Sequence, residues 1–538
     1  MGKRFQLSLA ILLAASLFLS ACGGVDQAAD GGEGKQVLNL MQTSEPPGLD
    51  SATTTDAVSN EILNNVMEGL YRLDKNNEPV EGMAEDVEIS KDKKTYTFKL
   101  REAEWSDGEP VTAQDFEYAW KRALDPKTKS EYAYIMYPVK GAQKYNTGKG
   151  NPEDVGVKAL DDKTLEVKLE EPIPYFQGLL TFTTFYPQRE DILEEHGNKY
   201  ATEVDKMVYN GPFVMSDWQH QKSYQLKKND KYWDHESVKL VEINFSIVKE
   251  TSTGVNLFET GKLDVATLSD DFVDKYADSE SVVEVPESTT FYLQFNTDEK
   301  FFDNGKIRKA FSMVLDRSTI TDKLRKDGSE PAAGLVPSVI QVEDQSFREL
   351  SGNHIKPKAD PKEAKKLLKE GLKEVGLDKL PTVELIGYDH DQGKKEQEYM
   401  KEALESALDI NVKIQILPFE QKLDRESNGD FQFSFAGWGA DYNDPMTFMD
   451  LMVTDGPYNR GGWSNKEYDK LIEKSLSNPD FEERAKDLAT AEKILMNEMG
   501  LVPIYHRSRL NLQDEKVKEL YRHPFGADRT FKWTYIEE

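Results

Sequence analysis

Residues 431–445, with the sequence FQFSFAGWGADYNDP, form the segment from which the rest of the chain can be interpreted. In its first half, aromatic side chains alternate with small or polar ones, which is the two-residue period of a β-strand. Gly437 and Gly439 then flank Trp438, and a glycine inside a strand often marks a place where another backbone comes close. Asp441 follows at once, and an Asn-Asp-Pro turn ends the segment. The pattern therefore predicts a strand that ends in a carboxylate.

A strand edge that ends in a carboxylate can bind an extended peptide. Main-chain hydrogen bonds along the edge supply affinity that does not depend on the sequence of the peptide. The carboxylate of Asp441 would bind the peptide's ammonium group by a charge-assisted hydrogen bond, typically worth about 1.5–3 kcal/mol. The alternative interpretation is a core strand followed by a surface turn, and the residues alone leave both open.

The segment also resembles a known motif. Residues 437–445 are similar to the Gly-Trp-x-Ala-Asp-Tyr-x-x-Pro segment of oligopeptide-binding proteins, the extracytoplasmic receptors of ABC peptide importers. In that family the Asp of the motif binds the α-amino group of the ligand, and the backbone just before it pairs with the peptide. The resemblance implies the first role for Asp441 and the second for Gly437, Trp438 and Gly439.

Residues 81–120 resemble the signature of the same receptors, with KTYTFKLR at 94–101, WSDG at 105–108 and PVTAQDF at 110–116. The alternation in 95–101 predicts a half-buried strand. Thr112 and Asp115 form a capping box, which predicts the start of an amphipathic helix. These roles are structural, so the signature points to the family and supplies no chemistry.

The resemblance also implies a ligand-facing segment near the start of the chain. Thr55, Asp56 and Ala57 precede a stretch with helical spacing and would pair with the peptide through their backbone. An ordinary strand-to-helix loop is the alternative for these three residues.

The fold that the resemblance implies is α/β and two-lobed, the periplasmic-binding-protein-like (type II) fold, with an additional subdomain in the first lobe. Strands alternating with helices of 10–20 residues also indicate α/β lobes, and 538 residues exceed what one core usually organises. The expected parts are a signal peptide (1–21), a flexible tether (22–36), a first lobe (37–67, 187–276 and 508–538), its extra subdomain (68–186) and a second lobe (277–507).

The N-terminus has the features of a lipoprotein signal. A basic pair precedes the apolar run 7–19, and Leu-Ser-Ala-Cys at 19–22 matches a lipobox, so cleavage before Cys22 and lipidation of its thiol are expected. The apolar run is shorter than the ~18–20 residues of a transmembrane helix. The Gly-rich residues 23–36 predict a tether with an r.m.s. length on the order of 20 Å. We therefore expect lipid anchoring at the extracytoplasmic face of the cell membrane.

Composition excludes several classes of function. A formal net charge of −29 disfavours nucleic acid as a partner. Cys22 is the only cysteine, so neither an intramolecular disulfide nor a thiolate metal site is expected. The seven histidines show no metal-ligand spacing, and the chain has neither a phosphate-binding Gly-rich loop nor a Gly-x-Ser-x-Gly elbow. Asp441 and Asp444 could be imagined as a glycosidase pair, but acidic pairs are common in a chain with 97 Asp and Glu. We expect no cofactor, no metal and no enzymatic activity.

Periodicity predicts further elements. Strands are expected at 37–40, 164–169, 291–296, 411–416 and 502–505, and helices at 58–70, 307–317, 361–376, 395–408, 465–476 and 481–499. Asp360 and Asp480 are expected as N-caps, and Gly376 and Gly500 as the ends of the helices that they start. In the helix at 58–70, Asn60 and Asn64 are expected on the polar face. Tyr132, Tyr134 and Tyr137 are interpreted as packed core rather than as the lining of a cleft.

The sequence thus predicts a monomeric solute-binding lipoprotein that captures oligopeptides between two lobes and delivers them to an ABC permease. Three alternatives stay open: a receptor of the same fold for another solute such as a nickel complex or a sugar, a sensor of a peptide pheromone, and a secreted hydrolase. One departure from the family concerns the peptide's carboxylate. Phe435 stands where receptors of the enteric type often have Arg, and neither the loop 388–395 (YDHDQGKK) nor Lys300 replaces it cleanly. The preferred peptide length therefore stays open.

Overall fold

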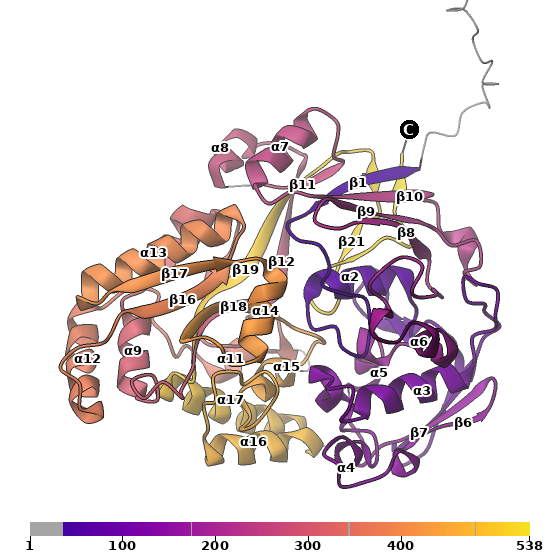
Figure 1. The fold of residues 1–538 in the computed structure, drawn as a ribbon, viewed down its shortest axis with the longest axis horizontal. Coiled ribbons are helices and arrows are strands. Elements are labelled where there is room, and N and C mark those ends of the chain that lie inside the picture. The colour runs from indigo at the N-terminus through magenta and orange to yellow at the C-terminus, as the bar shows by residue number, and fades with distance from the viewer. Residues whose placement is uncertain (1–35, 174, 269, 343–344, 479, 538) are drawn as a thin grey trace, which may run out of the picture. The chain divides into compact units, whose positions relative to one another are not determined.

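Two long antiparallel strands, β12 (Val282–Phe295) and β19 (Leu501–Gln513), form the middle of the largest sheet (Figure 1). The computed structural model describes residues 36–538 except 174, 269, 343–344, 479 and 538. The expected signal peptide, the lipidation site Cys22 and all but the last residue of the tether lie outside the described residues.

The largest sheet has the strand order β11-β19-β12-β18-β16-β17, with the short β13 (Glu330–Pro331) paired to β19. The remaining strands are β11 (Val265–Thr267), β18 (Phe433–Gly439), β16 (Val383–Tyr388) and β17 (Val412–Leu417). Helices in the same part of the chain include α9 (Gly305–Met313), α12 (Pro361–Val375), α13 (Asp391–Leu408), α16 (Lys466–Ser477) and α17 (Phe481–Glu498). This half runs from pink through orange to yellow in Figure 1.

The other half, indigo to magenta in Figure 1, contains two four-stranded sheets. The first has the order β1-β10-β9-β8, made of β1 (Val37–Gln42), β10 (Glu242–Ile247), β9 (Ser223–Lys228) and β8 (Phe213–Gln219). The second has the order β4-β5-β7-β6, made of β4 (Ala84–Ile89), β5 (Thr95–Leu100), β7 (Thr164–Lys168) and β6 (Val157–Asp161). The second sheet and α3 (Ala113–Leu124) lie within the residues expected to form the extra subdomain.

Helix caps predicted at Thr112, Asp360, Gly376 and Asp480 are confirmed, whereas α17 ends before Gly500, with Met499 as its left-handed C-cap. The backbone N–H of Thr112 donates to the carboxylate of Asp115 at 2.8 Å, so the capping box starts α3. Asp360 caps α12, which ends at Gly376 in the left-handed conformation that glycine favours. The side chain of Asp480 accepts from Glu483 N–H at 3.0 Å and caps α17.

The expectation for residues 58–70 is partly wrong. Helix α2 (Ala57–Val66) ends four residues early, and Asn60 and Asn64 are buried rather than on an exposed polar face. Both amides are satisfied inside the protein: Asn60 accepts from the Thr183 hydroxyl at 2.5 Å, and Asn64 donates to Thr530 at 3.0 Å. A buried polar side chain is tolerated when it is hydrogen-bonded, so the polar residues of this helix did not mark its solvent face.

The predicted strand at 291–296 is the end of a much longer strand. The polar run EST at 287–289 precedes it in β12 and is buried. Glu287 is accommodated there because Arg507 and Arg509 of the neighbouring β19 both form ion pairs with it. Pairing partners distant in the sequence thus extend the strand through residues that look like a turn.

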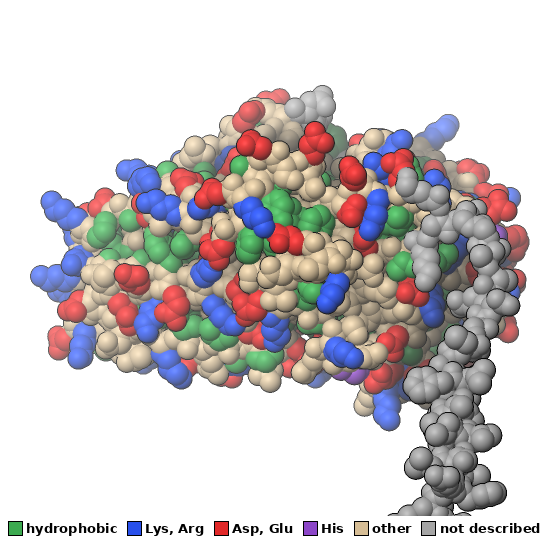
Figure 2. All heavy atoms as spheres, turned by 90° about the horizontal axis from the view of Figure 1, so that it is seen from above, with side chains coloured by type: hydrophobic (Ala, Val, Ile, Leu, Met, Phe, Trp, Pro, Cys, Tyr) green, Lys and Arg blue, Asp and Glu red, His purple; other side chains and the backbone are tan. Residues whose placement is uncertain are grey.

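Figure 2 shows one face of the molecule, on which acidic and basic side chains are interspersed with small hydrophobic areas. Among the residues that the structure describes, no helix is long and apolar enough to cross a bilayer. The same described residues contain no group of three His, Cys, Asp or Glu side chains placed to hold a metal ion.

Candidate ligand site

Strand β18 has one fully paired side and one mostly open side. On one side β12 pairs with it antiparallel along its whole length, from Thr289↔Gly439 to Phe295↔Phe433. On the other side β16 pairs only with Phe433 and Ser434. Residues 435–439, hereafter the open edge, therefore have no second strand partner in the described part of the chain. An unpaired edge presents N–H and C=O groups that an added strand can bind.

The two glycines of the open edge differ in what surrounds them. A Cβ atom at Gly437 would lie 3.0–3.2 Å from the ring of Phe291, and this ring stacks on Tyr505 with centroids 4.9 Å apart. A Cβ atom at Gly439 would meet only the hydroxyl of Thr289, at 3.2 Å. The close neighbour of Gly437 is thus a side chain of the same protein, opposite it on β12.

Asp441 follows the end of β18 and is buried, with 5% of its surface exposed. One carboxylate oxygen accepts a hydrogen bond from the Tyr132 hydroxyl at 2.9 Å, and the other accepts from the Thr447 hydroxyl at 3.3 Å. Its own N–H donates to Thr447 Oγ1 at 2.9 Å. Burial raises the pKa of the Asp441 carboxyl to about 7, against the smaller opposing effect of the two hydroxyl donors.

Two further carboxylates lie close to Asp441 in the sequence, with different partners. Asp444 forms a bidentate ion pair with Arg484, at 2.7 and 2.8 Å. Asp450 has a buried Oδ1 with no hydrogen-bond partner in the described part of the chain. Burial, followed by the charges of Asp441 and Asp444, raises the pKa of Asp450 well above its ordinary value. Of these three acids, only Asp444 has a cation beside it among the described residues.

Aromatic side chains surround the hydroxyl that binds Asp441. The ring centroid of Tyr132 lies 4.8 Å from that of Phe182, 5.2 Å from that of Tyr458 and 6.1 Å from that of Trp438. Trp438 and Tyr458 meet edge to face at 4.5 Å. Tyr132 is buried, as expected of a core residue, yet its hydroxyl contacts the proposed anchor. No sequence signal could relate it to Asp441, because the two residues are 309 positions apart.

The halves of the molecule meet around this group. The rings of Tyr175 and Tyr442 stack with centroids 5.2 Å apart, and the Arg484 guanidinium lies 5.4 Å from the centroid of the Tyr175 ring. Arg460 forms an ion pair with Glu131 at 2.8 Å. Asp441 and Tyr132 therefore lie at a boundary where the two halves bind each other directly.

The structure shows other surroundings for the three residues predicted near the start of the chain. Asp56 is the N-cap of α2, where its carboxylate accepts from Ser59 N–H at 2.9 Å, and burial raises its pKa to about 6. Thr55 is half-buried and Ala57 is exposed. Within the described residues, no hydrogen bond joins positions 55–57 to the open edge or to Asp441.

Most of the basic groups considered for a peptide's carboxylate are engaged elsewhere. His390 is buried, which lowers its pKa to about 4, and its Nδ1 accepts from Gly393 N–H as the cap of α13. Lys394 and Lys395 form ion pairs with Glu250 and Asp270. Phe435 is fully buried against aromatic rings.

A buried cation that the sequence did not single out lies near the open edge. Lys422, on α14 (Phe419–Ser427), pairs with Glu426 at 2.5 Å, and its ammonium lies 4.4 Å from the ring centroid of Tyr388. Burial lowers the pKa of Lys422, while Glu426 opposes that shift. The Ser434 hydroxyl donates to the same Glu426. The Lys422–Glu426 pair therefore lies beside the end of β18 that pairs with β16.

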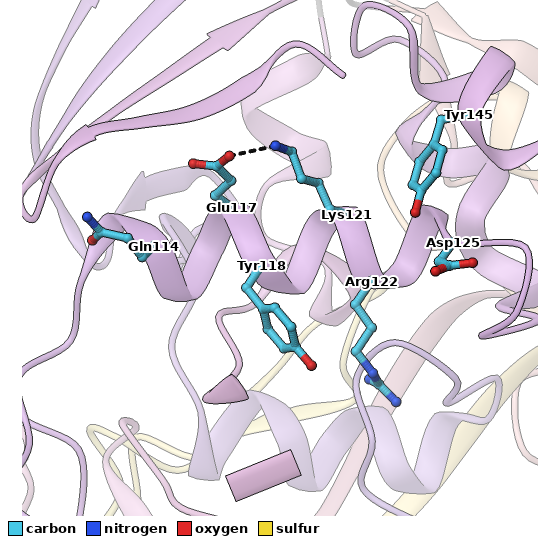
Figure 3. Close-up of a pocket in the computed structure, with 7 residues that line it drawn as sticks. All are labelled: Gln114, Glu117, Tyr118, Lys121, Arg122, Asp125 and Tyr145. Atoms are coloured by element: carbon cyan, nitrogen blue, oxygen red, sulfur yellow. Dashed lines mark hydrogen bonds and ion pairs between the residues drawn. The ribbon is translucent and has the colours of Figure 1, made fainter. Parts of the chain in front are cut away.

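A hollow of about 410 Å³ lies elsewhere, along α3 (Figure 3). Its lining includes the ion pair of Glu117 with Lys121, at 2.6 Å, and the half-buried Asp125. A second hollow, of about 600 Å³, lies along α13. Neither contains a residue of the open edge or Asp441, so we do not assign the ligand site to them.

Two α/β halves joined by long shared strands, with an unpaired strand edge and a buried acid at their boundary, are the architecture of a two-lobed solute-binding protein. The chain belongs to the bacterial extracellular solute-binding proteins, family 5, whose middle region matches residues 78–460. The two-lobed type II fold expected from the sequence is confirmed.

Several bacterial peptide-binding proteins are similar to this chain over nearly its whole length. The dipeptide-binding protein DppE of Bacillus subtilis is 38% identical over 525 residues, 96% of each chain. The oligopeptide-binding protein OppA of the same organism is also 38% identical, over 96% of this chain and 97% of its own. The structure of Listeria monocytogenes OppA bound to peptide superposes with a TM-score of 0.90 at 41% identity, covering 94% of this chain and all of that one.

Two structures of a more distant relative superpose on this protein to different extents. A structure of the Escherichia coli murein tripeptide-binding protein MppA superposes with a TM-score of 0.85, at 27% identity and over 94% of this chain and 99% of its own. The unliganded open form of MppA reaches only 0.59, at 27% identity and over 94% of this chain and 98% of its own. The lobes described here are therefore arranged differently from those of that open form, in agreement with the direct contacts around Asp441.

Proposed function

We propose that this protein is the peptide receptor of an ABC importer, which captures oligopeptides between its lobes and delivers them to the permease. The observation that carries the proposal is Asp441, a buried carboxylate at the end of an unpaired strand edge, which has no cation beside it among the residues that the structure describes. A peptide's ammonium group supplies the missing charge, and a buried carboxylate binds it more strongly than an exposed one does.

The proposed ammonium contact sets the direction of the bound peptide and limits how many of its residues can pair with β18. With its ammonium at Asp441, a peptide on the open edge runs antiparallel to β18, towards Phe435. Beyond that point β16 occupies the edge at Ser434, so about five ligand residues pair with the backbone, including that of Gly437, Trp438 and Gly439. Micromolar affinity needs only about −8 kcal/mol, which several such hydrogen bonds, the ammonium contact and some apolar burial can supply.

The other predictions from the sequence form part of the same proposal. The backbone of Thr55, Asp56 and Ala57 completes the site from the first lobe, made of 37–67, 187–276 and 508–538. Residues 68–186 are its extra subdomain, and 277–507 form the second lobe. With these bounds the chain crosses between lobes next to β12 and inside β19, which pair with each other. A peptide bound between the lobes would then stabilise their closure.

We further propose that the receptor is a monomer without catalytic activity, tethered to the extracytoplasmic face of the membrane by lipid on Cys22. In cells, Cys22→Ser should release the protein from the membrane fraction into the medium without changing peptide affinity. Retention of the variant in membranes would contradict the lipid anchor and leave the peptide site untouched.

Native mass spectrometry of the purified protein tests the main proposal. A heterogeneous series of mass additions, each matching a short peptide, is expected, and fragmentation should recover the peptides intact. N-terminal acetylation of one such peptide should weaken its binding strongly, because acetylation removes the charge that Asp441 binds. Equal affinity of acetylated and free peptides would instead favour another solute, and cleavage of the peptide on long incubation would favour a hydrolase.

A further inference from the structure

We propose that Asp450 is a specificity-determining residue, which together with Asp441 selects peptides whose first residue carries a second positive charge. The inference rests on the proposed peptide site. It adds a preference for Lys or Arg as the first residue of the ligand.

The charges near the proposed ammonium site are not balanced. Asp444 is neutralised by Arg484 in a bidentate pair. Asp441 has only hydroxyl partners, and no ion pair joins Asp450 to a Lys, Arg or His in the described part of the chain. One ligand ammonium can therefore neutralise Asp441, while Asp450 still has no counter-charge.

Asp450 is held close to Asp441 by a short segment of chain. The Thr447 hydroxyl binds Asp441, and α15 (Met446–Met449) leads directly from there to Asp450. Thr447 and Asp450 are three residues apart on this helical turn, so both lie on the same face of it. The charge of Asp441 is also among the causes that raise the pKa of Asp450. The half-buried Tyr134 is affected by both charges, which raise its pKa beyond the effect of burial.

Other unpartnered atoms mark the same region as a place for a ligand. The indole Nε1 of Trp438 and the hydroxyl of Tyr458 are buried without a hydrogen-bond partner among the described residues, as is Oδ1 of Asp450. Trp438 and Tyr458 are each 7% exposed and are in contact, and Tyr458 also packs on the Tyr132 ring. Unsatisfied buried polar atoms are rare in folded proteins, and a ligand is one way of satisfying them.

The chemistry that fits is a flexible cation near the α-ammonium. A lysine side chain carries its ammonium on a four-carbon stem, and arginine carries a planar fork that binds a carboxylate with two hydrogen bonds. With a neutral first residue, the buried Oδ1 of Asp450 has no cation to bind, so the carboxyl stays protonated. With a lysine there, Asp450 is ionised and releases its proton, so the two kinds of peptide differ in the protons released on binding.

Calorimetry with two peptides tests the inference: Lys-Phe-Ala-Phe-Ala and the same peptide with norleucine, which lacks the side-chain ammonium, in place of Lys. The wild type should bind the Lys peptide at least tenfold more tightly and with greater proton release. Asp450→Asn should bind both peptides within about threefold of each other. The matched control Asp455→Asn removes the same charge from an exposed, left-handed position nearby that Asn accepts, and should keep the preference.

The outcomes separate this inference from the function on which it rests. Equal affinity of the wild type for the two peptides overturns the role of Asp450 and leaves the peptide receptor intact. A preference that survives in Asp450→Asn also overturns it. Failure of the wild type to bind either peptide contradicts the proposed function itself. The comparison in the wild type does not depend on how well any variant folds.

Discussion

Asp441 combines a motif position with an environment that changes its chemistry. A carboxylate on a surface turn would be ionised at neutral pH, but burial brings the pKa of Asp441 to about 7. The empty site can thus hold the group protonated, whereas an ammonium ligand requires it ionised. In the proposed complex, ligand binding and proton release would therefore be coupled at this residue.

Asp441→Asn should weaken the binding of free-amine peptides by about 2–5 kcal/mol, because the peptide's buried ammonium loses its charged partner. The amide keeps the size of the carboxylate and its oxygen can still accept from Tyr132, so melting temperature should not fall at neutral pH. Calorimetry with a free and an acetylated peptide measures the effect. A matching loss for the acetylated peptide would show that the variant had damaged the site as a whole.

Affinity for a free-amine peptide should rise as pH increases from 5 to 7. Below its pKa of about 7, Asp441 must lose a proton before it binds the ammonium, so binding should be roughly 50-fold weaker at pH 5 than at pH 7. Above pH 8 affinity should fall again, because the peptide's amino group loses its proton. In Asp441→Asn, affinity should change little between pH 5 and pH 7. If the variant lost affinity at low pH as the wild type does, the loss would come from the titration of another group.

The raised pKa of Asp441 also makes the stability of the folded protein depend on pH. Because the carboxyl of Asp441 binds its proton more tightly in the folded than in the unfolded chain, its effect destabilises the empty protein as pH rises from about 4 to 7. Asp441→Asn lacks this effect. Its stability relative to the wild type should therefore increase over that range.

The motif predicts Asp441, but the sequence could not predict what surrounds it. Tyr132 and Thr447 satisfy its oxygens, and only folding brings Tyr132 across the boundary between the halves. Asn60 and Asn64 show the same limit, since their buried partners Thr183 and Thr530 are distant in the sequence. Local pattern indicates where a polar side chain stands in its element, whereas burial depends on which other element covers it.

At the scale of elements, caps were predicted more reliably than pairing. Asp360, Gly376 and Asp480 act within a few residues of themselves, so their signals are complete in the sequence. The extent of β12 depends instead on β19, whose arginines neutralise Glu287. The open edge of β18 likewise exists because β16 stops pairing at Ser434, which no property of residues 431–445 could indicate.

Gly437→Ala should lower the free energy of unfolding by about 1–3 kcal/mol, because its methyl group would press on the Phe291 ring, which is held by Tyr505. Gly439→Ala is the matched control in the same strand, where only the Thr289 hydroxyl lies close, and it should be nearly neutral. Urea denaturation of both variants measures the difference. Equal stability of the two would mean that the Phe291 ring moves aside freely.

At the scale of the whole molecule, β12 and β19 connect parts that also meet directly. The contacts across the boundary include the Tyr175–Tyr442 stack and the Arg460–Glu131 ion pair. The lower similarity to the unliganded open form of MppA is consistent with these contacts holding the lobes together. Their free energy therefore belongs to closure and contributes to the apparent affinity for a ligand.

Glu131→Gln should shift the ligand-free protein towards an open form, because it removes the charge that pairs with Arg460 across the boundary. The pair is only partly buried, with 26% of the Glu131 side chain exposed, so affinity for peptide should fall by about fivefold, equivalent to about 1 kcal/mol. Small-angle scattering should give a larger radius of gyration than the wild type without peptide. With saturating peptide the two radii should agree, because the ligand supplies enough free energy to close both.

Glu153→Gln is the matched control, since Glu153 is exposed in the same subdomain. It should leave both radii and the affinity unchanged. If Glu131→Gln also matched the wild type with and without peptide, the ion pair would be a consequence of closure and not one of its causes. If the radius of gyration of Glu131→Gln stayed large at saturating peptide, the proposal that a bound peptide closes the lobes would itself be contradicted.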